Sequence, residues 1–453
     1  MRNGILAART LAEAGRSWEA RERLLALADQ HPGNAEVLDA LLSVTFEAQD
    51  WPGYLEAATR LAALFPEDAE LAFARGEAAL RNGYPATGVD YFEQSLARFP
   101  DLPEAADVRA ALPRLHAVLP DYLATLGAEP GEGRARALQH ERVQHLMSLD
   151  RMKEARDAAR ALHVSYPRFV AALNNLGYAA WQLGALEEAE QAHREALALR
   201  PDDVHALSNL TRTLFLGGRE QEARALAERL KASTHAGTDR WLKVAEALTL
   251  LGDDAGVLEA FAHAEREAKP GVPEKDARLR TIAAVSALRL GDESRARTLL
   301  EEALQRFADT EEARANLAAL ELPAPVRPLL NAAPLEAWLS PPQLERVRAR
   351  LGAAKKPEAQ RRARAELLSE LPGLRTVVPA LLDRGNPEGV RLALELCEHS
   401  EEPALLEALG RFARGERGHI RDRVRAAHAL VVAGAAREEE LALWTGRGRQ
   451  PFA

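Results

Sequence analysis

The sequence has one cysteine and few aromatic residues. Cys397 is the single cysteine among 453 residues, which excludes an intramolecular disulfide and a cysteine metal cluster. Aromatic residues make up only 5% of the chain, whereas alanine and leucine dominate. This composition favours an all-α protein. Cys397 stands in an apolar helical stretch, so we expect a buried thiol that acts as a small hydrophobic side chain rather than a reactive one.

The sequence also lacks long hydrophobic runs. None approaches the roughly 20 apolar residues that cross a bilayer, and the first residues have no hydrophobic segment of a signal peptide. We therefore expect a cytoplasmic protein with no membrane contact.

Motifs that carry chemistry are missing as well. There is no His-Glu-x-x-His motif, no phosphate-binding glycine loop and no Gly-x-Ser-x-Gly motif. His140 and His145 are five residues apart, which does not place them on one face of a helix. The sequence predicts no catalytic residue, no metal ligand and no cofactor, and hence a protein that is not an enzyme.

Charge is distributed unevenly along the chain, whose net charge is −9. Residues 1–324 hold 38 Lys and Arg against 51 Asp and Glu, whereas residues 325–453 hold 21 against 17. The acidic first part argues against nonspecific binding of nucleic acid there.

A period of 34 residues runs through most of the chain. It is marked by prolines, by glycines seventeen residues before a proline or its expected place, and by small residues five positions after those glycines. This punctuation is typical of a solenoid of helical hairpins, which binds partners along an extended concave surface. We expect almost no strand and a hairpin turn at each glycine. The prolines are Pro32, Pro66, Pro100, Pro167 and Pro201, and the glycines are Gly15, Gly83, Gly184, Gly218, Gly252 and Gly291.

One unit, residues 170–203, shows the physical basis of the period. Leu173 and Leu176 are three residues apart and share one face of a first helix. Gly184 provides the left-handed residue that ends this helix. Ala189 is small where a second helix would cross the first closely.

This pattern resembles the tetratricopeptide repeat. The residues that carry the resemblance are Leu173, Leu176, Gly177, Ala180, Gly184, Ala189, His193, Ala196 and Pro201. The resemblance implies an α-α superhelix with eight units. In the divergent second unit Gln49 replaces the turn glycine. The units are 1–34, 35–68, 69–102, 136–169, 170–203, 204–237, 238–271 and 277–310.

Two proline-rich segments interrupt the period and set the expected domains. The first should form irregular short helices, because it contains Pro103, Pro113, Pro120 and Pro130. A smaller break at 269–273 lengthens a loop. The expected domains are an N-terminal tetratricopeptide array (1–102), an irregular helical connection (103–135), a central array (136–321), a proline-rich linker (322–342) and a smaller HEAT-like helical domain (343–453).

The HEAT-like prediction depends on a second pattern near the C-terminus. The pairs Val390-Arg391 and Val424-Arg425 are 34 residues apart and belong to predicted helices. This resembles HEAT repeats, another solenoid of helical hairpins. The alternative is a plain helical cap over the end of the array.

The candidate binding surface follows from the tetratricopeptide resemblance. In peptide-binding members an asparagine six residues into the unit bonds the ligand backbone, and here Asn175 and Asn209 hold that place. An amide offers both a donor and an acceptor to a peptide group. Exposed aromatic residues beside paired amides favour a groove over an ordinary solvated surface. The other candidate groove residues are Asn174, Tyr178, Trp181, His205 and Arg212.

The predicted function is protein–protein interaction, as a scaffold or adaptor that binds a partner protein or peptide in this groove. The alternative is a nucleic-acid-associated protein that uses the basic C-terminal domain. An arginine-rich stretch from Arg411 to Arg425 could contact phosphates, but its interleaved acids indicate a paired or solvated face. The sequence does not indicate the oligomeric state.

Overall fold

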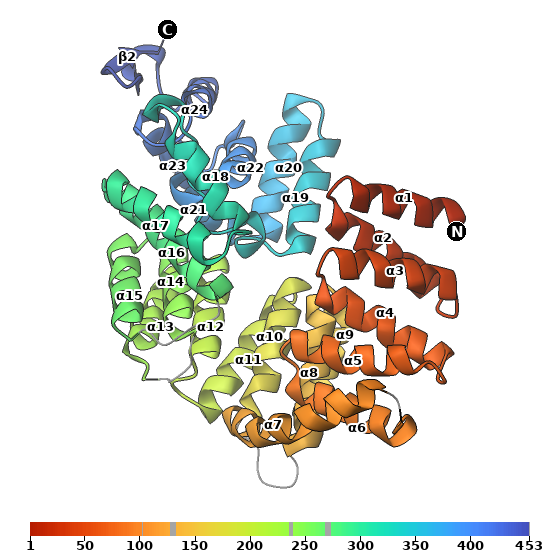
Figure 1. Cartoon of the computed structure of the whole chain (residues 1–453). Helices are drawn as coiled ribbons and strands as arrows, with labels where there is room; N and C mark the ends of the chain where they lie inside the picture. The colour runs from red at the N-terminus through yellow and green to blue at the C-terminus, as the bar shows by residue number, and fades with distance from the viewer. Residues whose placement is uncertain (102, 127–132, 235–238, 268–272, 453) are drawn as a thin grey trace. The chain divides into compact units, whose positions relative to one another are not determined.

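The computed structural model describes residues 1–101, 103–126, 133–234, 239–267 and 273–452. In these residues the chain is all-α apart from one short hairpin of strands (Figure 1). The chain packs into two compact units, residues 1–176 and 177–453, and each unit is described by itself. Pro130 and most of the 269–273 break lie outside the described residues.

The first unit consists of helical hairpins and one long single helix. Its helices are α1 (Arg2–Glu13), α2 (Ser17–Gln30), α3 (Ala35–Glu47), α4 (Trp51–Leu64), α5 (Ala69–Arg81), α6 (Pro85–Arg98), α7 (Pro103–Thr125), α8 (Gly133–Ser148) and α9 (Met152–Ser165), followed by the first residues of α10 (Val170–Gln182).

In its described residues the second unit continues the hairpins and adds seven further α-helices and the strands. Its helices are the rest of α10, then α11 (Leu186–Leu199), α12 (Val204–Leu216), α13 (Glu220–Ala232), α14 (Arg240–Leu251), α15 (Asp254–Arg266), α16 (Pro273–Arg289), α17 (Glu293–Arg306), α18 (Glu311–Leu320), α19 (Pro341–Ala353), α20 (Pro357–Glu370), α21 (Leu374–Arg384), α22 (Pro387–Cys397), α23 (Pro403–Arg414) and α24 (Ile420–Val432). Short 3-10 turns are η1 (Ala324–Val326), η2 (Leu335–Ala337) and η3 (Glu438–Glu440), and the strands are β1 (Ala442–Trp444) and β2 (Arg449–Pro451).

The predicted hairpin turns are confirmed at all six glycines. Each glycine has a positive φ between 74° and 92°, directly after the first helix of its hairpin. Such a conformation is open to glycine and strained for other residues. Two units without the glycine keep the same turn with Gln49 (φ 54°) and Asp150 (φ 58°).

The eighth and twenty-fourth residues of each 34-residue repeat are matched in size. Gly177 faces the His193 ring, and Gly76 faces the Phe92 ring, so closely that a Cβ on either glycine would overlap the ring. In each of the eight repeats one residue of the pair is small and the other is larger. The other pairs are Ala8 with Leu24, Leu42 with Ala58, Val143 with Ala159, Thr211 with Ala227, Ala245 with Phe261, and Ala284 with Leu300.

The prediction of irregular short helices in 103–135 is wrong for residues 103–125. They form a single helix of 23 residues, α7, with Pro113 and Pro120 inside it. Both prolines are exposed, whereas Val108, Leu112 and Leu119 are buried on another face of the helix. These apolar residues recur at helical spacing across the first proline, and their packing offsets the hydrogen bonds that proline cannot donate.

Helix α8 packs directly against earlier hairpins of the first unit. Glu141 on α8 accepts hydrogen bonds from the backbone N–H groups of Ala86 (3.0 Å) and Thr87 (2.7 Å), at the start of α6. Glu56 on α4 accepts from His145 (3.2 Å) and Arg151 (3.1 Å). Burial raises the pKa of Glu56, but hydrogen bonding to His145 and the charge of Arg60 outweigh it and bring this pKa to about 2.

The proline-rich segment before α19 packs against the repeats of the second unit. Trp338 is fully buried, and its ring centroid lies 6.4 Å from that of Phe215 on α12. Asn316 on α18 donates to the Asn331 carbonyl (2.9 Å) and accepts from the Asn331 N–H (2.7 Å). The predicted domain boundaries at 103–135 and 322–342 stay predictions.

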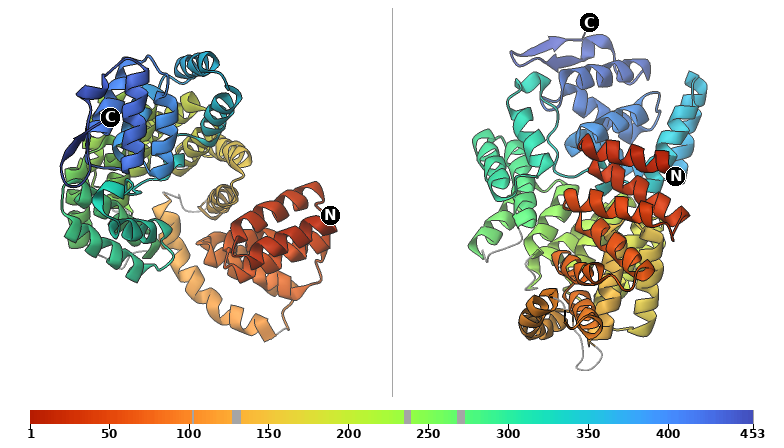
Figure 2. Two further views of the ribbon diagram at one scale, coloured as in Figure 1. Left: turned by 90° about the horizontal axis from the view of Figure 1, so that it is seen from above. Right: turned by 45° about the vertical axis from the view of Figure 1, so that its right-hand side comes forward.

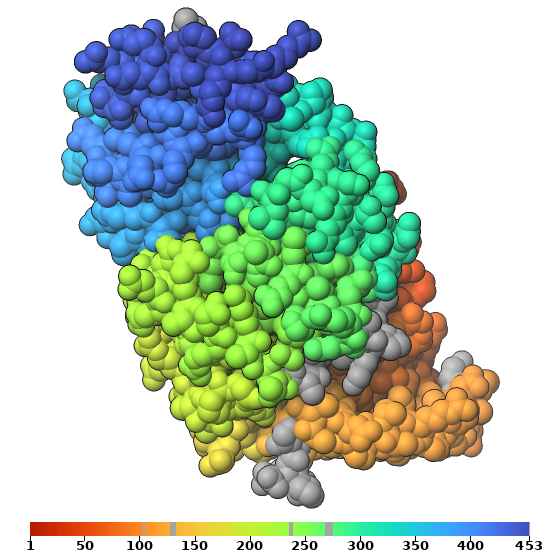
Figure 3. Space-filling view, turned by 90° about the vertical axis from the view of Figure 1, so that its left-hand side faces the viewer, coloured from red at the N-terminus to blue at the C-terminus, as the bar shows by residue number. Residues whose placement is uncertain are grey.

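The last helices form two stacked hairpins. Helix α21 packs on α22 and α23 on α24, while α21 also contacts α23 and α22 contacts α24. These helices are among the blue ones in Figure 2. Of these helices, α21 contacts α12 of the repeats. In the space-filling view the blue C-terminal part adjoins the green part of the same unit (Figure 3). Whether the hairpins are HEAT repeats stays a prediction.

The polar C-terminal segment contains the strands, which the sequence did not predict. Strands β1 and β2 pair antiparallel, with Leu443 opposite Gln450. Gly446 and Gly448 have positive φ in the turn between them. Leu443 is buried, and Arg423 on α24 lies over the Trp444 ring at 5.7 Å. Tertiary packing therefore holds strands of only three residues.

Candidate functional site

The first helices of successive hairpins in the second unit share a polar face. Helix α12 packs beside α14, and α14 beside α16. Tyr178, Arg212 and Glu246 lie 34 residues apart on α10, α12 and α14, and all three are half-buried. The repeat therefore places a phenol, a guanidinium and a carboxylate in consecutive hairpins.

Arg212 lies at the centre of this face. Its Cζ is 4.2 Å from the centroid of the Trp181 ring and 5.8 Å from that of Tyr178. Its Nη2 donates to Asn209 Oδ1 at 3.3 Å, while its buried Nε has no hydrogen-bond partner. Burial lowers the pKa of Arg212, against the influence of Tyr178 and Glu246. The side chain is half-buried, so the accessible part of its guanidinium can bind a further acceptor.

Glu246 links two helices of the face, α14 and α16. Its carboxylate accepts from Lys243 Nζ (2.9 Å) on its own helix and from Arg278 Nε (3.3 Å) on α16. Burial raises the pKa of Glu246, but Lys243, Arg278 and Arg212 outweigh it and lower this pKa below its ordinary value. The carboxylate therefore stays ionised at neutral pH.

The edge of the face is also polar. His205 Nε2 lies 3.7 Å from Asp239 Oδ2, and Lys275 Nζ lies 3.4 Å from the same oxygen. Ser208 Oγ donates to the Lys243 carbonyl at 3.2 Å. These contacts connect neighbouring hairpins through polar groups.

The structure distributes the predicted site residues over both units. In the second unit it brings together Tyr178, Trp181, Asn209 and Arg212, with His205 on the same helix as Arg212. The prediction of an exposed Trp181 is wrong. Its side chain is 2% exposed, because the indole packs into the core and the Arg212 guanidinium covers its ring.

Asn174 and Asn175 belong to the first unit and are half-buried. Asn175 Nδ2 lies 3.2 Å from Nδ1 of His140 on α8. Burial lowers the pKa of His140 to about 4, so its ring is neutral and its Nδ1 can accept this bond. The amide thus has a partner within the protein.

Sequence reasoning missed Glu246 and Arg278. Glu246 could have been found, since it stands one period after Arg212 and two after Tyr178. Arg278 follows the 269–273 break, which shifts the register and hides its relation to the earlier units.

A separate acidic hollow lies on the first unit, between α3, α4 and α5. It has a volume of about 530 Å³, and its acidic lining residues are Glu36, Asp39, Asp68 and Glu70. No lysine or arginine lines it, and its walls include Leu42, Leu61 and Leu71. Its charge would repel a nucleic-acid backbone.

The arginine-rich stretch near the C-terminus is largely engaged within the protein. Arg423 is fully buried and donates to the carbonyls of Gly415 (3.0 Å) and Gly418 (3.1 Å). Arg425 pairs with Glu398 at 2.6 Å. This stretch is not a continuous free basic strip.

The described residues contain neither a metal-binding cluster nor a membrane-spanning helix. No cluster of three or more His, Cys, Asp or Glu there has the arrangement to hold a metal ion. Among the described helices, none combines the length and the apolar character that a bilayer span needs. Cys397 is buried, and burial raises the pKa of its thiol to about 12, so the thiol is protonated at neutral pH.

Comparison with known proteins identifies the repeats. A family model described as tetratricopeptide repeat matches residues 180–248. The matched residues include Trp181, Asn209, Arg212 and Glu246 of the polar face.

Similar solved structures include a tetratricopeptide repeat protein from Parabacteroides merdae and the TPR domain of P58(IPK). The first is 14% identical with a TM-score of 0.37, over 64% of this chain and 99% of that chain. The second is 15% identical with a TM-score of 0.24, over 91% of this chain and 97% of that chain. No curated protein matches the chain significantly.

Proposed function

We propose that this protein is an interaction scaffold that binds a segment of a partner protein across the polar face of its tetratricopeptide repeats. The observation that carries the proposal is Arg212. Its guanidinium is stacked on Trp181, held by Asn209 and left with an unused Nε donor. The side chain as a whole is only half-buried, so a partner that supplies an acceptor to the accessible part of the guanidinium would gain a charge-assisted hydrogen bond.

The chemistry of the face suits a peptide segment. Asn209 offers an amide, Arg212 and Lys243 offer donors, and Glu246 offers an acceptor. Asn174 and Asn175, which belong to the first unit, would supply further amides to a partner, as the tetratricopeptide resemblance implies. The proposed ligand is therefore an extended or helical segment whose backbone and polar side chains are read by these groups.

The test starts with partner capture. The full chain is used as bait in the source cell, bound proteins are identified by mass spectrometry, and the affinity of a purified partner is measured. The double variant Asn175→Ala/Asn209→Ala should weaken binding by about 1–3 kcal/mol in total, the usual cost of lost buried hydrogen bonds. Each substitution also removes one hydrogen bond within the protein, to His140 or to Arg212, so a loss of about 0.5–1.5 kcal/mol of stability per site is expected, and circular dichroism checks that the variant stays folded.

The matched control is Gln191→Ala/Gln305→Ala. Both glutamines are exposed on second helices, α11 and α17, so this variant removes two amides away from the proposed surface. It should bind the partner as the unchanged protein does. Equal affinity of the asparagine variant and the unchanged protein would refute the proposal.

Nucleic-acid binding by the C-terminal helices is the alternative. It has less support, because Arg423 is buried and Arg425 is paired. Salt-dependent binding of DNA or RNA would favour it over the scaffold. A cytoplasmic location and the lack of enzymatic activity stay predictions.

A further inference from the structure

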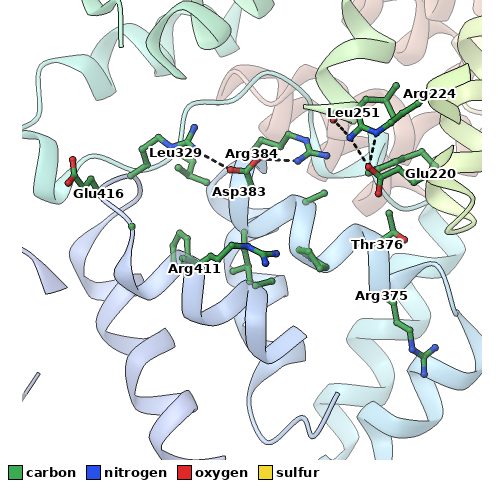
Figure 4. A pocket seen from close by; sticks show the side chains of 18 residues that line it. Glu220, Arg224, Leu251, Leu329, Arg375, Thr376, Asp383, Arg384, Arg411 and Glu416 are labelled. Carbon is green, nitrogen blue, oxygen red and sulfur yellow. Dashed lines mark hydrogen bonds and ion pairs between the residues drawn. The ribbon is translucent and has the colours of Figure 1, made fainter. Parts of the chain in front are cut away.

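A cavity lies between the repeats and the C-terminal helices of the second unit. Its volume is about 540 Å³, within the range of small-ligand sites, roughly 300–1,000 Å³. The ends of α12, α13 and α14 form one side, and α21 and α23 form the other (Figure 4). It is distinct from the polar face of the first helices.

The charges that line this cavity do not balance. Its arginines are Arg224, Arg375, Arg384, Arg411 and Arg417, whereas its acids are Glu220, Asp383 and Glu416. Arg375 pairs with Glu402 and Arg411 pairs with Glu407, but neither of these glutamates lines the cavity. The lining therefore carries a positive excess.

Several of the positive charges gather around Asp383. Its carboxylate accepts from Arg417 (2.9 Å), Arg384 (3.1 Å) and Arg289 (2.9 Å), so one negative charge faces three guanidinium groups. Arg289 has a second acid, Asp254, at 2.8 Å. Burial lowers the pKa of both Arg384 and Arg417. Positive charge in such a place is stabilised by an anion.

Two of these arginines donate to backbone carbonyls, so they are less able to bind a ligand. Arg384 donates to the Leu250 carbonyl (2.6 Å), and Arg224 to the Leu251 carbonyl (3.0 Å), at the C-terminal end of α14. These contacts satisfy helix carbonyls and tie α21 to the repeats. Arg411 and Arg417 have no such backbone contact, and the Arg411 guanidinium projects into the cavity (Figure 4).

We propose that this cavity binds a small, multiply charged phosphate-bearing molecule, with Arg411 and Arg417 as its main phosphate ligands. The guanidinium fork matches the geometry of phosphate oxygens. Thr376 adds a hydroxyl, and the apolar walls include Phe215, Pro379 and Phe412. Those walls would contact an uncharged part of the ligand, such as a nucleoside.

The test is a calorimetric titration of the full chain with inorganic pyrophosphate. We expect saturable binding with a Kd below about 1 mM. Arg411→Gln should weaken it about tenfold, as the loss of one charge-assisted hydrogen bond predicts. Arg417→Gln should have a similar effect. Arg411→Gln carries the test even if Arg417→Gln perturbs folding, because Arg411 pairs with an exposed glutamate on its own helix.

The matched control is Arg362→Gln. Arg362 is also exposed on a helix and pairs with a glutamate four residues away, Glu366, but it does not line the cavity. This variant removes the same charge and should bind pyrophosphate as the unchanged protein does. Equal weakening by Arg362→Gln and Arg411→Gln would overturn the proposal, as would the absence of saturable binding.

Two further titrations separate the sources of the phosphate. Binding of ADP more than about tenfold tighter than pyrophosphate would identify a nucleotide that uses the apolar walls, whereas equal affinities would identify the free anion. Either result supports a phosphate site. Citrate should bind weakly, and citrate binding as tight as that of pyrophosphate would overturn the assignment to phosphate.

Discussion

At the scale of single residues, two hairpin turns hold a side chain in the left-handed conformation. Gln49 (φ 54°) and Asp150 (φ 58°) stand where the other turns have glycine. Gln49 is exposed at the surface. A left-handed conformation costs an ordinary residue about 1–2 kcal/mol. These turns therefore persist because the two helices on either side pack together.

The first prediction is that Gln49→Gly stabilises the first unit by up to about 1 kcal/mol, because it removes this strain at some cost in chain entropy. The reverse change, Gly15→Ala, should destabilise by about 1 kcal/mol. Nothing lies within 4 Å of a Cβ added to Gly15, so the effect would be that of the backbone alone. Chemical denaturation measures both changes.

Gly33→Ala is the matched control. A Cβ there also meets nothing within 4 Å, and its φ is not positive. It should therefore lack the strain of Gly15→Ala. If Gly15→Ala and Gly33→Ala shift the denaturation midpoint equally, the strain explanation is wrong.

The second prediction concerns His193, which is 1% exposed. Burial, followed by the charge of Arg212, lowers the pKa of His193 to about 3, although Asp203 acts in the other direction. The unfolded chain binds this proton near pH 6.5 and the folded chain does not. The contribution of His193 to the free energy of unfolding is therefore fully present above about pH 6.5. It is lost as the pH decreases toward 3, by about 1.4 kcal/mol per pH unit.

His193→Phe should remove the part of the stability loss at low pH that comes from protonation of His193. Phe92 and Phe261 occupy the same position in other units, so the ring fits. Urea unfolding at about pH 7.5 and pH 5 should show a smaller loss of stability in the variant than in the unchanged protein. Equal losses in the two proteins would mean that His193 is protonated in the folded state.

At the scale of the helical hairpin, the third prediction tests the size match between the eighth and twenty-fourth residues. Gly177→Ala should destabilise the second unit by about 1–3 kcal/mol, because its Cβ overlaps the His193 ring. Adding His193→Leu should recover much of this loss. The last unit already combines Ala284 with Leu300 at these positions.

A double-mutant cycle gives the measurement, since residues in contact are coupled by about 0.5–3 kcal/mol. Unfolding is measured for the two single variants and the double variant. Additive effects would contradict direct packing of His193 on Gly177.

Local patterns in the sequence were enough to predict the hairpins but not the contacts between distant segments. The 34-residue period identified the turn glycines, because a tight turn after a helix needs a left-handed residue. The same reasoning failed for α7, where Pro113 and Pro120 indicated a break although the buried side of the helix continues past them. It also failed for Trp181, because the residue that covers its ring, Arg212, belongs to the next 34-residue repeat.

At the scale of the whole molecule, the fourth prediction concerns the proline-rich segment 322–342. A flexible linker would be cut early by proteases. The structure instead buries Trp338 and holds Arg327, which donates to the Leu320 carbonyl (3.0 Å) and to Glu293 (2.8 Å). We therefore expect this segment to be cut late by a protease of broad specificity.

Trp338→Ala should reverse that order. Loss of a buried tryptophan costs about 3–5 kcal/mol, so cleavage within 322–342 should become an early event. Trp18→Ala is the control, since Trp18 is 63% exposed and its loss should leave the pattern unchanged. Early cleavage of this segment in the unchanged protein would show that it is a flexible linker after all.

The size match within each hairpin also constrains how such a chain can evolve. A unit such as Gly177 with His193 and a unit such as Thr211 with Ala227 differ in which partner is large. Conversion of one into the other requires two substitutions, and the order in which they arise matters. Enlarging the small partner first produces a clash, whereas shrinking the large partner first leaves a cavity. Either intermediate is less stable than both end states, so such an exchange requires that neighbouring hairpins stabilise the chain enough to tolerate the loss.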